Sequence, residues 1–164
     1  MMRYPKKFKK AFTLIELLVV ISIIAILATL LIANYNAARG RARDAQRKSD
    51  LRNIQTALRL YYNDYASYPV STSTKKIKGC VNGTTTCTWG QAFSVTATNP
   101  DQIYMNILPA DPQSDRTYVY DQTGPDAYTL SACLENVSDD KCGNPCTSAY
   151  GVGTPTGCIY TVQP

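Results

Sequence analysis

One carboxylate, Glu16, stands almost at the start of a long apolar run that directly follows a cluster of lysines. The run extends over 21 residues, from Phe12 to Ile32, and its other polar side chains are three hydroxyls. A charged carboxylate is costly in hydrocarbon unless a cation or a hydrogen-bond donor pairs with it. The chemistry that this spacing predicts is therefore ion pairing at a membrane, and Glu16 requires a partner.

Six cysteines form a second set of reactive side chains, and all lie in the C-terminal half of the chain. An even number downstream of an apolar segment predicts disulfides in an oxidising compartment. Zinc binding is the alternative, but the chain has no histidine, and Cys142 and Cys146 lack the C-x2-C spacing of most zinc sites. Proximity in the sequence favours the bonds Cys80–Cys87, Cys133–Cys142 and Cys146–Cys158.

No spacing in the sequence points to a catalytic centre. The chain has no histidine, no G-x-S-x-G and no phosphate-cradling loop, so we expect neither enzyme activity nor a cofactor. Asp139 and Asp140, with Glu135 and Asn136 nearby, offer oxygen ligands of the kind that calcium prefers. Their spacing matches no defined calcium loop, so they are a calcium candidate only and no metal is expected.

The apolar run divides the chain into segments with different predicted structures. As a helix it would span about 32 Å, close to the thickness of a hydrocarbon core. The leader before it carries a charge of +5, which should hold the N-terminus in the cytoplasm, and the remainder is neutral. No A-x-A-like cleavage site follows the run, so any processing must occur before it. The predicted parts are a leader (1–11), a transmembrane helix (12–33), its amphipathic continuation (34–68) and a globular domain (69–164).

The amphipathic continuation carries an apolar stripe with the three- and four-residue spacing of a helix. Arg47, Lys48, Arg52 and Arg59 are expected to lie largely off this stripe. One helix should run from Phe12 to about Ala66, and Tyr68-Pro69 ends it, because the residue before a proline is forced out of the helical region. The stripe consists of Leu51, Ile54, Leu58, Tyr61, Tyr62 and Tyr65, and we expect its tyrosines to form core rather than a ligand or electron-transfer surface.

Alternating β-branched and aromatic residues predict a small antiparallel sheet downstream. Residues 117–121 and 127–134 flank a turn and should form a hairpin, with 158–162 as a third strand. Residues 70–90 are predicted to be a loop, and 89–108 to contain a short helix or turn. The predicted fold class is α+β: a long N-terminal helix packed on a small antiparallel sheet with disulfide-stapled loops.

The start of the chain resembles type IV pilins and the pseudopilins of type II secretion systems. The basic leader, the small Ala11 and the run Phe12-Thr-Leu-Ile-Glu-Leu-Leu18 carry this resemblance. It continues more loosely through residues 42–69 and into segments of the globular domain. The cysteine-bearing loops match no part of the family that we can place.

The resemblance implies processing and assembly. A membrane prepilin peptidase would cut between Ala11, where most members have glycine, and Phe12, which would then be N-methylated. The new amine of Phe12, in the same or a neighbouring copy, would pair with Glu16, and Thr13 would complete the assembly motif. The resemblance also implies a homo-oligomeric helical filament, an assembly ATPase and a membrane platform as partners. Before assembly the chain would be a single-pass protein of the cytoplasmic membrane with its C-terminal domain outside. After assembly it would form a cell-surface or periplasmic filament.

Several functions remain open at this point. The filament could be an extended type IV pilus or the pseudopilus of a type II secretion system. A DNA-binding minor pilin and a membrane-tethered binding domain are further alternatives. Residues 39–59 carry +5 and residues 60–164 carry −4, a split that suits attraction between subunits. Contact of the basic face with lipid headgroups is a second possibility, and nucleic acid is not expected as a partner.

Overall fold

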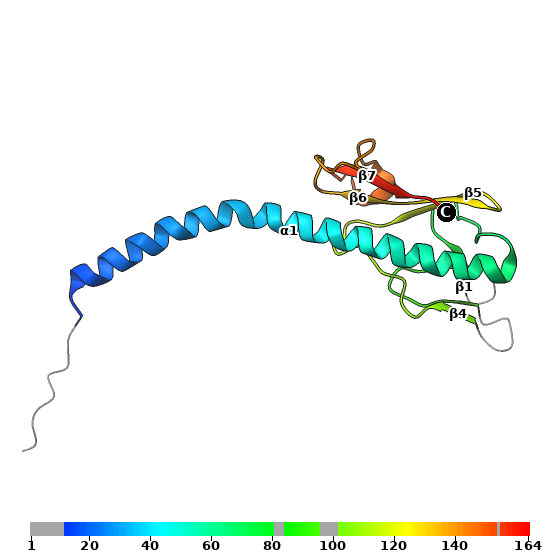
Figure 1. The fold of residues 1–164 in the computed structure, drawn as a ribbon, viewed down its shortest axis with the longest axis horizontal. Helices are drawn as coiled ribbons and strands as arrows, with labels where there is room; N and C mark the ends of the chain where they lie inside the picture. The colour runs from blue at the N-terminus through cyan, green and yellow to red at the C-terminus, as the bar shows by residue number, and fades with distance from the viewer. Residues whose placement is uncertain (1–11, 81–83, 96–101, 154) are drawn as a thin grey trace, which may run out of the picture. The chain divides into compact units, whose positions relative to one another are not determined.

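The computed structural model describes residues 12–80, 84–95, 102–153 and 155–164, with the side chains of residues 30, 33 and 34 left aside. The chain forms two compact units, one ending at Arg39 and the other running from Gly40 to Pro164. Helix α1 (Leu14–Tyr65) contributes to both units (Figure 1). The predicted leader, including Ala11, lies outside the described residues.

In the N-terminal unit, α1 begins with a capping box. Thr13 is the residue before the first helical turn, and its Oγ1 accepts a hydrogen bond from the Glu16 backbone N–H at 3.3 Å. The Glu16 carboxylate accepts hydrogen bonds from the backbone N–H and the hydroxyl of Thr13, at 2.9 and 2.7 Å. These reciprocal bonds satisfy amide groups that a helix start otherwise leaves unpaired.

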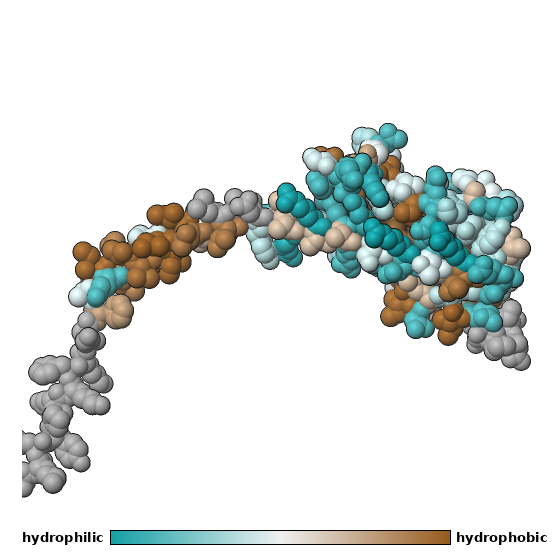
Figure 2. Space-filling view, viewed as in Figure 1, coloured by the Kyte–Doolittle hydropathy of each residue, from teal (hydrophilic) through white to brown (hydrophobic). Residues whose placement is uncertain are grey.

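The apolar side chains of this unit are exposed on a single helix. Figure 2 shows them as a hydrophobic stretch of α1, and Leu14, Ile24 and Leu31 are 81, 58 and 72% exposed. Within the part of the chain that the structure describes, no helix combines the length and hydropathy needed to cross a membrane. The transmembrane helix predicted at 12–33 therefore remains a prediction.

The second unit contains three small antiparallel sheets. A three-stranded sheet has the order β5–β6–β7, and two further pairs are β1–β2 and β3–β4. In Figure 1 the three-stranded sheet lies along one side of the second half of α1, and β1 and β4 lie on the other side. The elements are β1 (Lys78–Cys80), β2 (Thr85–Thr86), β3 (Phe93–Val95), β4 (Gln102–Met105), β5 (Val119–Gly124), β6 (Ala127–Leu134), a 3-10 helix η1 (Ser148–Tyr150) and β7 (Cys158–Val162).

The predicted helix stripe and sheet form the core of this unit. Leu51, Ile54 and Leu58 are fully buried against the sheet, with Leu130 and Leu134 of β6 in the same cluster. Tyr61 stacks on Phe93 and meets the Tyr104 ring edge-on, with centroids 5.6 and 5.3 Å apart. Tyr61 thus serves as core, as predicted, and Tyr62 packs against the core while partly buried, whereas Tyr65 is 40% exposed. The α+β fold class is confirmed, as are the 117–134 hairpin and the strand at 158–162.

Two local predictions were wrong. Residues 89–108 contain the antiparallel pair β3–β4 instead of the predicted short helix or turn, because Phe93 and Val95 alternate inward with the exposure pattern of a strand. The segment predicted as a loop, 70–90, holds the short strands β1 and β2. α1 ends at Tyr65, close to the predicted end at about Ala66, since Ala66 adopts a left-handed conformation with φ of 51°.

The six cysteines form three disulfides, but only one pairing follows sequence proximity. Cys80–Cys87 is confirmed, whereas the other two bonds are Cys133–Cys146 and Cys142–Cys158. Residues alternate between the two faces of a strand, so Cys133 of β6 and Cys158 of β7 point to opposite faces of the sheet. Cys133 packs with Cys146 and Tyr150 on the outer face, while Cys158 belongs to the core on the helix side.

Candidate functional site

The residues of the predicted assembly motif lie together at the start of α1. Phe12 and Glu16 line one shallow hollow with Ile15, Val19 and Val20. Phe12 is 82% exposed, and the Glu16 carboxylate is bonded to Thr13 as the capping box requires. In this chain the nitrogen of Phe12 is an uncharged peptide nitrogen, so the ion pair expected for Glu16 stays a prediction. Ala11, the other half of the predicted cleavage site, lies outside the described residues.

A second polar site joins the other half of α1 to the globular domain. Arg47 is completely buried, although the sequence pattern placed it largely off the apolar stripe. Its guanidinium donates to both carboxylate oxygens of Asp111 at 2.8 and 2.9 Å. It also donates to Asp44 and Glu135, each at 2.8 Å. We call Arg43, Asp44, Arg47, Asp111 and Glu135 the ion cluster.

The ion cluster is satisfied by further hydrogen bonds. Arg43 binds the carboxylate of Glu135 with two nitrogens, at 2.7 and 2.6 Å. Asp44 accepts hydrogen bonds from the backbone N–H groups of Glu135 and Asn136, each at 2.9 Å. A buried charge is tolerated only with this degree of pairing. The cluster therefore fixes the segment after β6 on the helix.

The electrostatic effects follow from these contacts. The hydrogen bond from Arg43 is the main cause that lowers the pKa of Glu135 from its usual 4.5 to about 2, and burial opposes it. Burial alone would lower the pKa of Arg47, but its bonds to Asp111 and Glu135 outweigh burial and raise that pKa. Both groups consequently stay charged across the physiological range.

The basic face predicted on residues 39–59 is only partly free. Arg43 and Arg47 belong to the ion cluster, and Lys48 pairs with Asp139 at 2.5 Å. Several of the charges that suggested attraction between subunits therefore form ion pairs within one chain. Fewer cations remain for a nucleic acid than the sequence suggested. Among the basic side chains of residues 40–59, those of Arg41, Arg52 and Arg59 are exposed.

The calcium candidates do not gather further ligands. The carboxylate of Asp139 is engaged by Lys48 and by the backbone N–H of Lys141. Asp140 is exposed beside it. Among the described residues there is no group of three or more histidine, cysteine, aspartate or glutamate side chains that could hold a metal.

The sequence contained a signal for the ion cluster that we did not use. Asp44, Arg47, Leu51, Ile54 and Leu58 recur at spacings of three and four, so the charged pair extends the apolar stripe by about two turns. The acidic partners Asp111 and Glu135 carried no comparable signal, since only the fold brings them to the helix.

Comparisons with known proteins find similarity at the start of the chain and, at lower identity, over most of its length. The family described as "Prokaryotic N-terminal methylation motif" matches residues 6–32. The chain is 51% identical over 59 residues to "Type IV wide pilus major component PilA4" of Thermus thermophilus, covering 36% of this chain and 45% of that protein. It is 28% identical over 145 residues to "Type II secretion system core protein G" of Aeromonas hydrophila, covering 85% of this chain and 94% of that protein. No solved structure matches the chain.

Proposed function

We propose that this chain, a member of the type IV pilin and type II secretion pseudopilin class, is a structural subunit of a helical filament assembled from a membrane. It would be made as a precursor, cut between Ala11 and Phe12, and methylated on the nitrogen of Phe12. The match of the methylation motif over residues 6–32 is the observation that carries this proposal. A prepilin peptidase is the partner implied by the cut, and the filament is implied by the class.

The exposed apolar half of α1 supports this proposal, because such a surface is stable only when other molecules bury it. Its large side chains, such as Ile15, Ile26 and Ile32, are 69, 63 and 66% exposed, because a helix alone cannot bury the side chains on its own surface. Contiguous apolar surface of this kind marks a membrane or protein interaction site. A bilayer would cover it before assembly, and the same surface of neighbouring copies would cover it in the filament.

Glu16 would then change partner on processing. In the uncut chain its carboxylate is held by Thr13, directly next to Phe12. The cut would create a charged secondary amine on Phe12, in the same copy or a neighbour, within reach of that carboxylate. In a nonpolar surrounding, removing one member of such a pair leaves an uncompensated charge.

The test is Glu16→Val, with Ser22→Val as a matched control in the same apolar run. We expect the Glu16 variant to be processed and inserted but to form no filaments, because the Phe12 amine would be buried alone. The control should assemble normally, since the Ser22 hydroxyl bonds only to the carbonyl of Val19. Mass spectrometry of the processed chain and electron micrographs check both. A normal filament yield for Glu16→Val would refute the proposal.

A secretion pseudopilus is the second candidate function. The relative named for type II secretion is aligned along 94% of its length, whereas the pilus component is aligned along 45% of its length. The identity to the pilus component is higher but is limited to 59 residues. Micrographs of source cells with and without the gene separate the two candidates. Loss of long surface filaments supports a pilus, and loss of protein secretion without loss of filaments supports a pseudopilus.

A further inference from the structure

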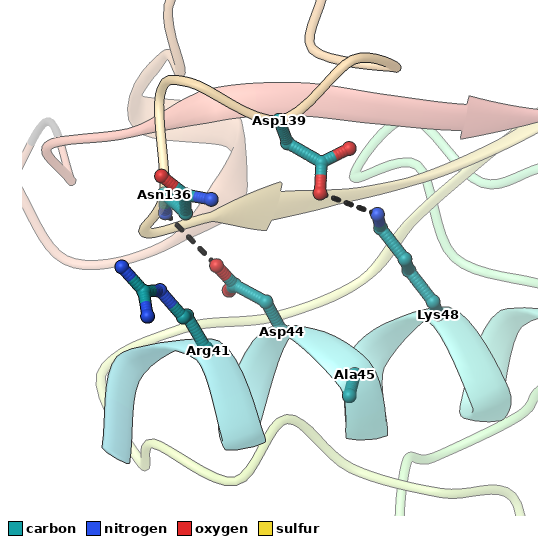
Figure 3. Close-up of a pocket in the computed structure, with 6 residues that line it drawn as sticks. All are labelled: Arg41, Asp44, Ala45, Lys48, Asn136 and Asp139. Atoms are coloured by element: carbon teal, nitrogen blue, oxygen red, sulfur yellow. Dashed lines mark hydrogen bonds and ion pairs between the residues drawn. The ribbon is translucent and has the colours of Figure 1, made fainter. Parts of the chain in front are cut away.

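A polar pocket of about 180 Å³ lies between α1 and the loop that follows β6. Arg41, Asp44, Ala45 and Lys48 line it from the helix, and Asn136 and Asp139 line it from the loop (Figure 3). Arg41 and Lys48 are seven residues apart, so they stand two turns, or about 10 Å, apart on one helix face. Asp44 and Ala45 lie between them on the helix, and the Asp44 carboxylate accepts a hydrogen bond from the backbone N–H of Asn136 (Figure 3).

The pocket offers hydrogen-bond donors and few free acceptors. Asp44 already accepts from Arg47, from the Glu135 backbone N–H and from the Asn136 backbone N–H. Asp139 already accepts from Lys48 and from the backbone N–H of Lys141. Within the described part of the chain, the guanidinium of Arg41 enters no ion pair and is exposed. A guanidinium carries five donors, and Lys48 keeps two beyond its bond to Asp139.

This inventory fits an oxyanion. The guanidinium of Arg41 can bind two carboxylate or phosphate oxygens at once, whereas Lys48 is already paired with Asp139 and adds its remaining donors at the far end of the pocket. The pocket volume of about 180 Å³ is well above the space that a single water molecule needs. A carboxylate side chain from another molecule could therefore approach Arg41 from the solvent side.

We propose that this pocket receives an exposed aspartate carboxylate from a second copy of the chain. The inference rests on the proposed filament function and names the contact that the globular units would use. In a helical filament, head-to-tail contacts join two different surface patches of identical copies. The chain supplies suitable carboxylates that are exposed and have no cationic partner among the described residues, namely Asp64, Asp115, Asp126 and Asp140.

The first experiment reverses the charge of Arg41 in the full chain, expressed with its assembly system. Arg41→Glu should lower the yield of sedimented filaments on the order of tenfold, as expected when a desolvated ion pair becomes a repulsion. Arg59→Glu is the matched control, because Arg59 is exposed on the same helix but lies outside the pocket. One reversal among Asp64→Arg, Asp115→Arg, Asp126→Arg and Asp140→Arg should restore the yield of Arg41→Glu and identify the donor.

A second experiment fills the pocket without changing charge. Ala45→Leu should lower filament yield severalfold, whereas Ala42→Leu, at an exposed helix position outside the pocket, should not. Equal losses for Arg41→Glu and Arg59→Glu would overturn the inference, as would a loss that none of the four aspartate reversals restores. If the unmodified chain forms no filaments, the proposed function fails; if it does and the pocket variants do as well, only this inference fails.

Discussion

The first half of α1 exposes apolar side chains to the surroundings, whereas the second half buries a charged one. Leu27 is 55% exposed in the N-terminal unit, and Arg47 is 0% exposed in the globular unit. Both arrangements run against the usual distribution of residues between surface and interior. The two halves differ in what covers these side chains, since the globular unit supplies its own partners for Arg47, whereas the described residues of the N-terminal unit leave Leu27 exposed.

The comparison separates two kinds of stability. The globular unit is closed by contacts within the chain, which include the ion cluster and three disulfides. The apolar half of α1 gains its stabilisation only when a bilayer or other copies cover it. Substitutions in the globular half should therefore change the free energy of unfolding, whereas substitutions in the apolar half should change assembly.

The largest expected effect comes from Arg47→Met. Removing the cation leaves Asp44 and Asp111 buried without their partner, which should lower the free energy of unfolding of the globular unit by about 3–5 kcal/mol. Arg52→Met, on the exposed side of the same helix, should change it by less than about 0.5 kcal/mol. Fluorescence of Trp89, the single tryptophan, reports unfolding because its ring packs on Tyr118 at 5.7 Å. Similar values for both variants would contradict the role assigned to the cluster.

The same substitution in both halves of α1 gives the most direct comparison. Leu58→Ala should cost about 2–5 kcal/mol of unfolding free energy, because Leu58 is fully buried in the core. Leu27→Ala should leave unfolding of the globular unit unchanged. Denaturant titration of the full chain in detergent, followed by Trp89 fluorescence, measures both. A measurable loss for Leu27→Ala would mean that the two halves are not energetically separate.

A smaller effect is expected from replacing Cys142 and Cys158 together by serine. The bond closes a loop with a sequence separation of 16, and its loss should cost about 3 kcal/mol. The double replacement of Cys80 and Cys87, with a separation of 7, should cost less. Thermal unfolding compares the two variants. The reverse order would show that strand contacts, rather than the cross-link, hold the loop after β6.

The smallest effect is a pH dependence from Glu135. Its pKa is lowered to about 2, so its contribution is complete above its usual pKa of 4.5 and is lost as the pH falls from there toward 2. We expect a decrease of about 2 kcal/mol over this range, after allowance for partial exposure of the side chain. Glu135→Gln should flatten that part of the profile. An unchanged acid profile in this variant would remove Glu135 from the cluster's energetics.

Local patterns in the sequence predicted the parts of the fold that depend on neighbours along the chain. The stripe through Leu51, Ile54 and Leu58, the hairpin at 117–134 and the strand at 158–162 all follow from periodicity. The short β3–β4 hairpin was missed because strands of three and four residues leave little periodicity to detect.

The remaining features depend on residues far apart in the sequence. Cys133 pairs with Cys146 because the strand turns its side chain to the outer face, which counting residues between cysteines does not reveal. Asp111 and Glu135 reach Arg47 only after the sheet has formed. The pocket at Arg41 likewise requires the loop after β6 to be fixed on the helix, so no sequence pattern could indicate it.

The two interleaved disulfides also limit how the chain responds to a pulling force. Without them, a load between Cys133 and Cys158 would act on 25 residue steps of chain. With them, the covalent path crosses both bonds and only the four steps from Cys142 to Cys146. Roughly 70 Å of extensible chain is thereby removed. A filament under tension would therefore meet an almost inextensible segment at this edge of the sheet, and any lengthening would have to come from elsewhere in the subunit.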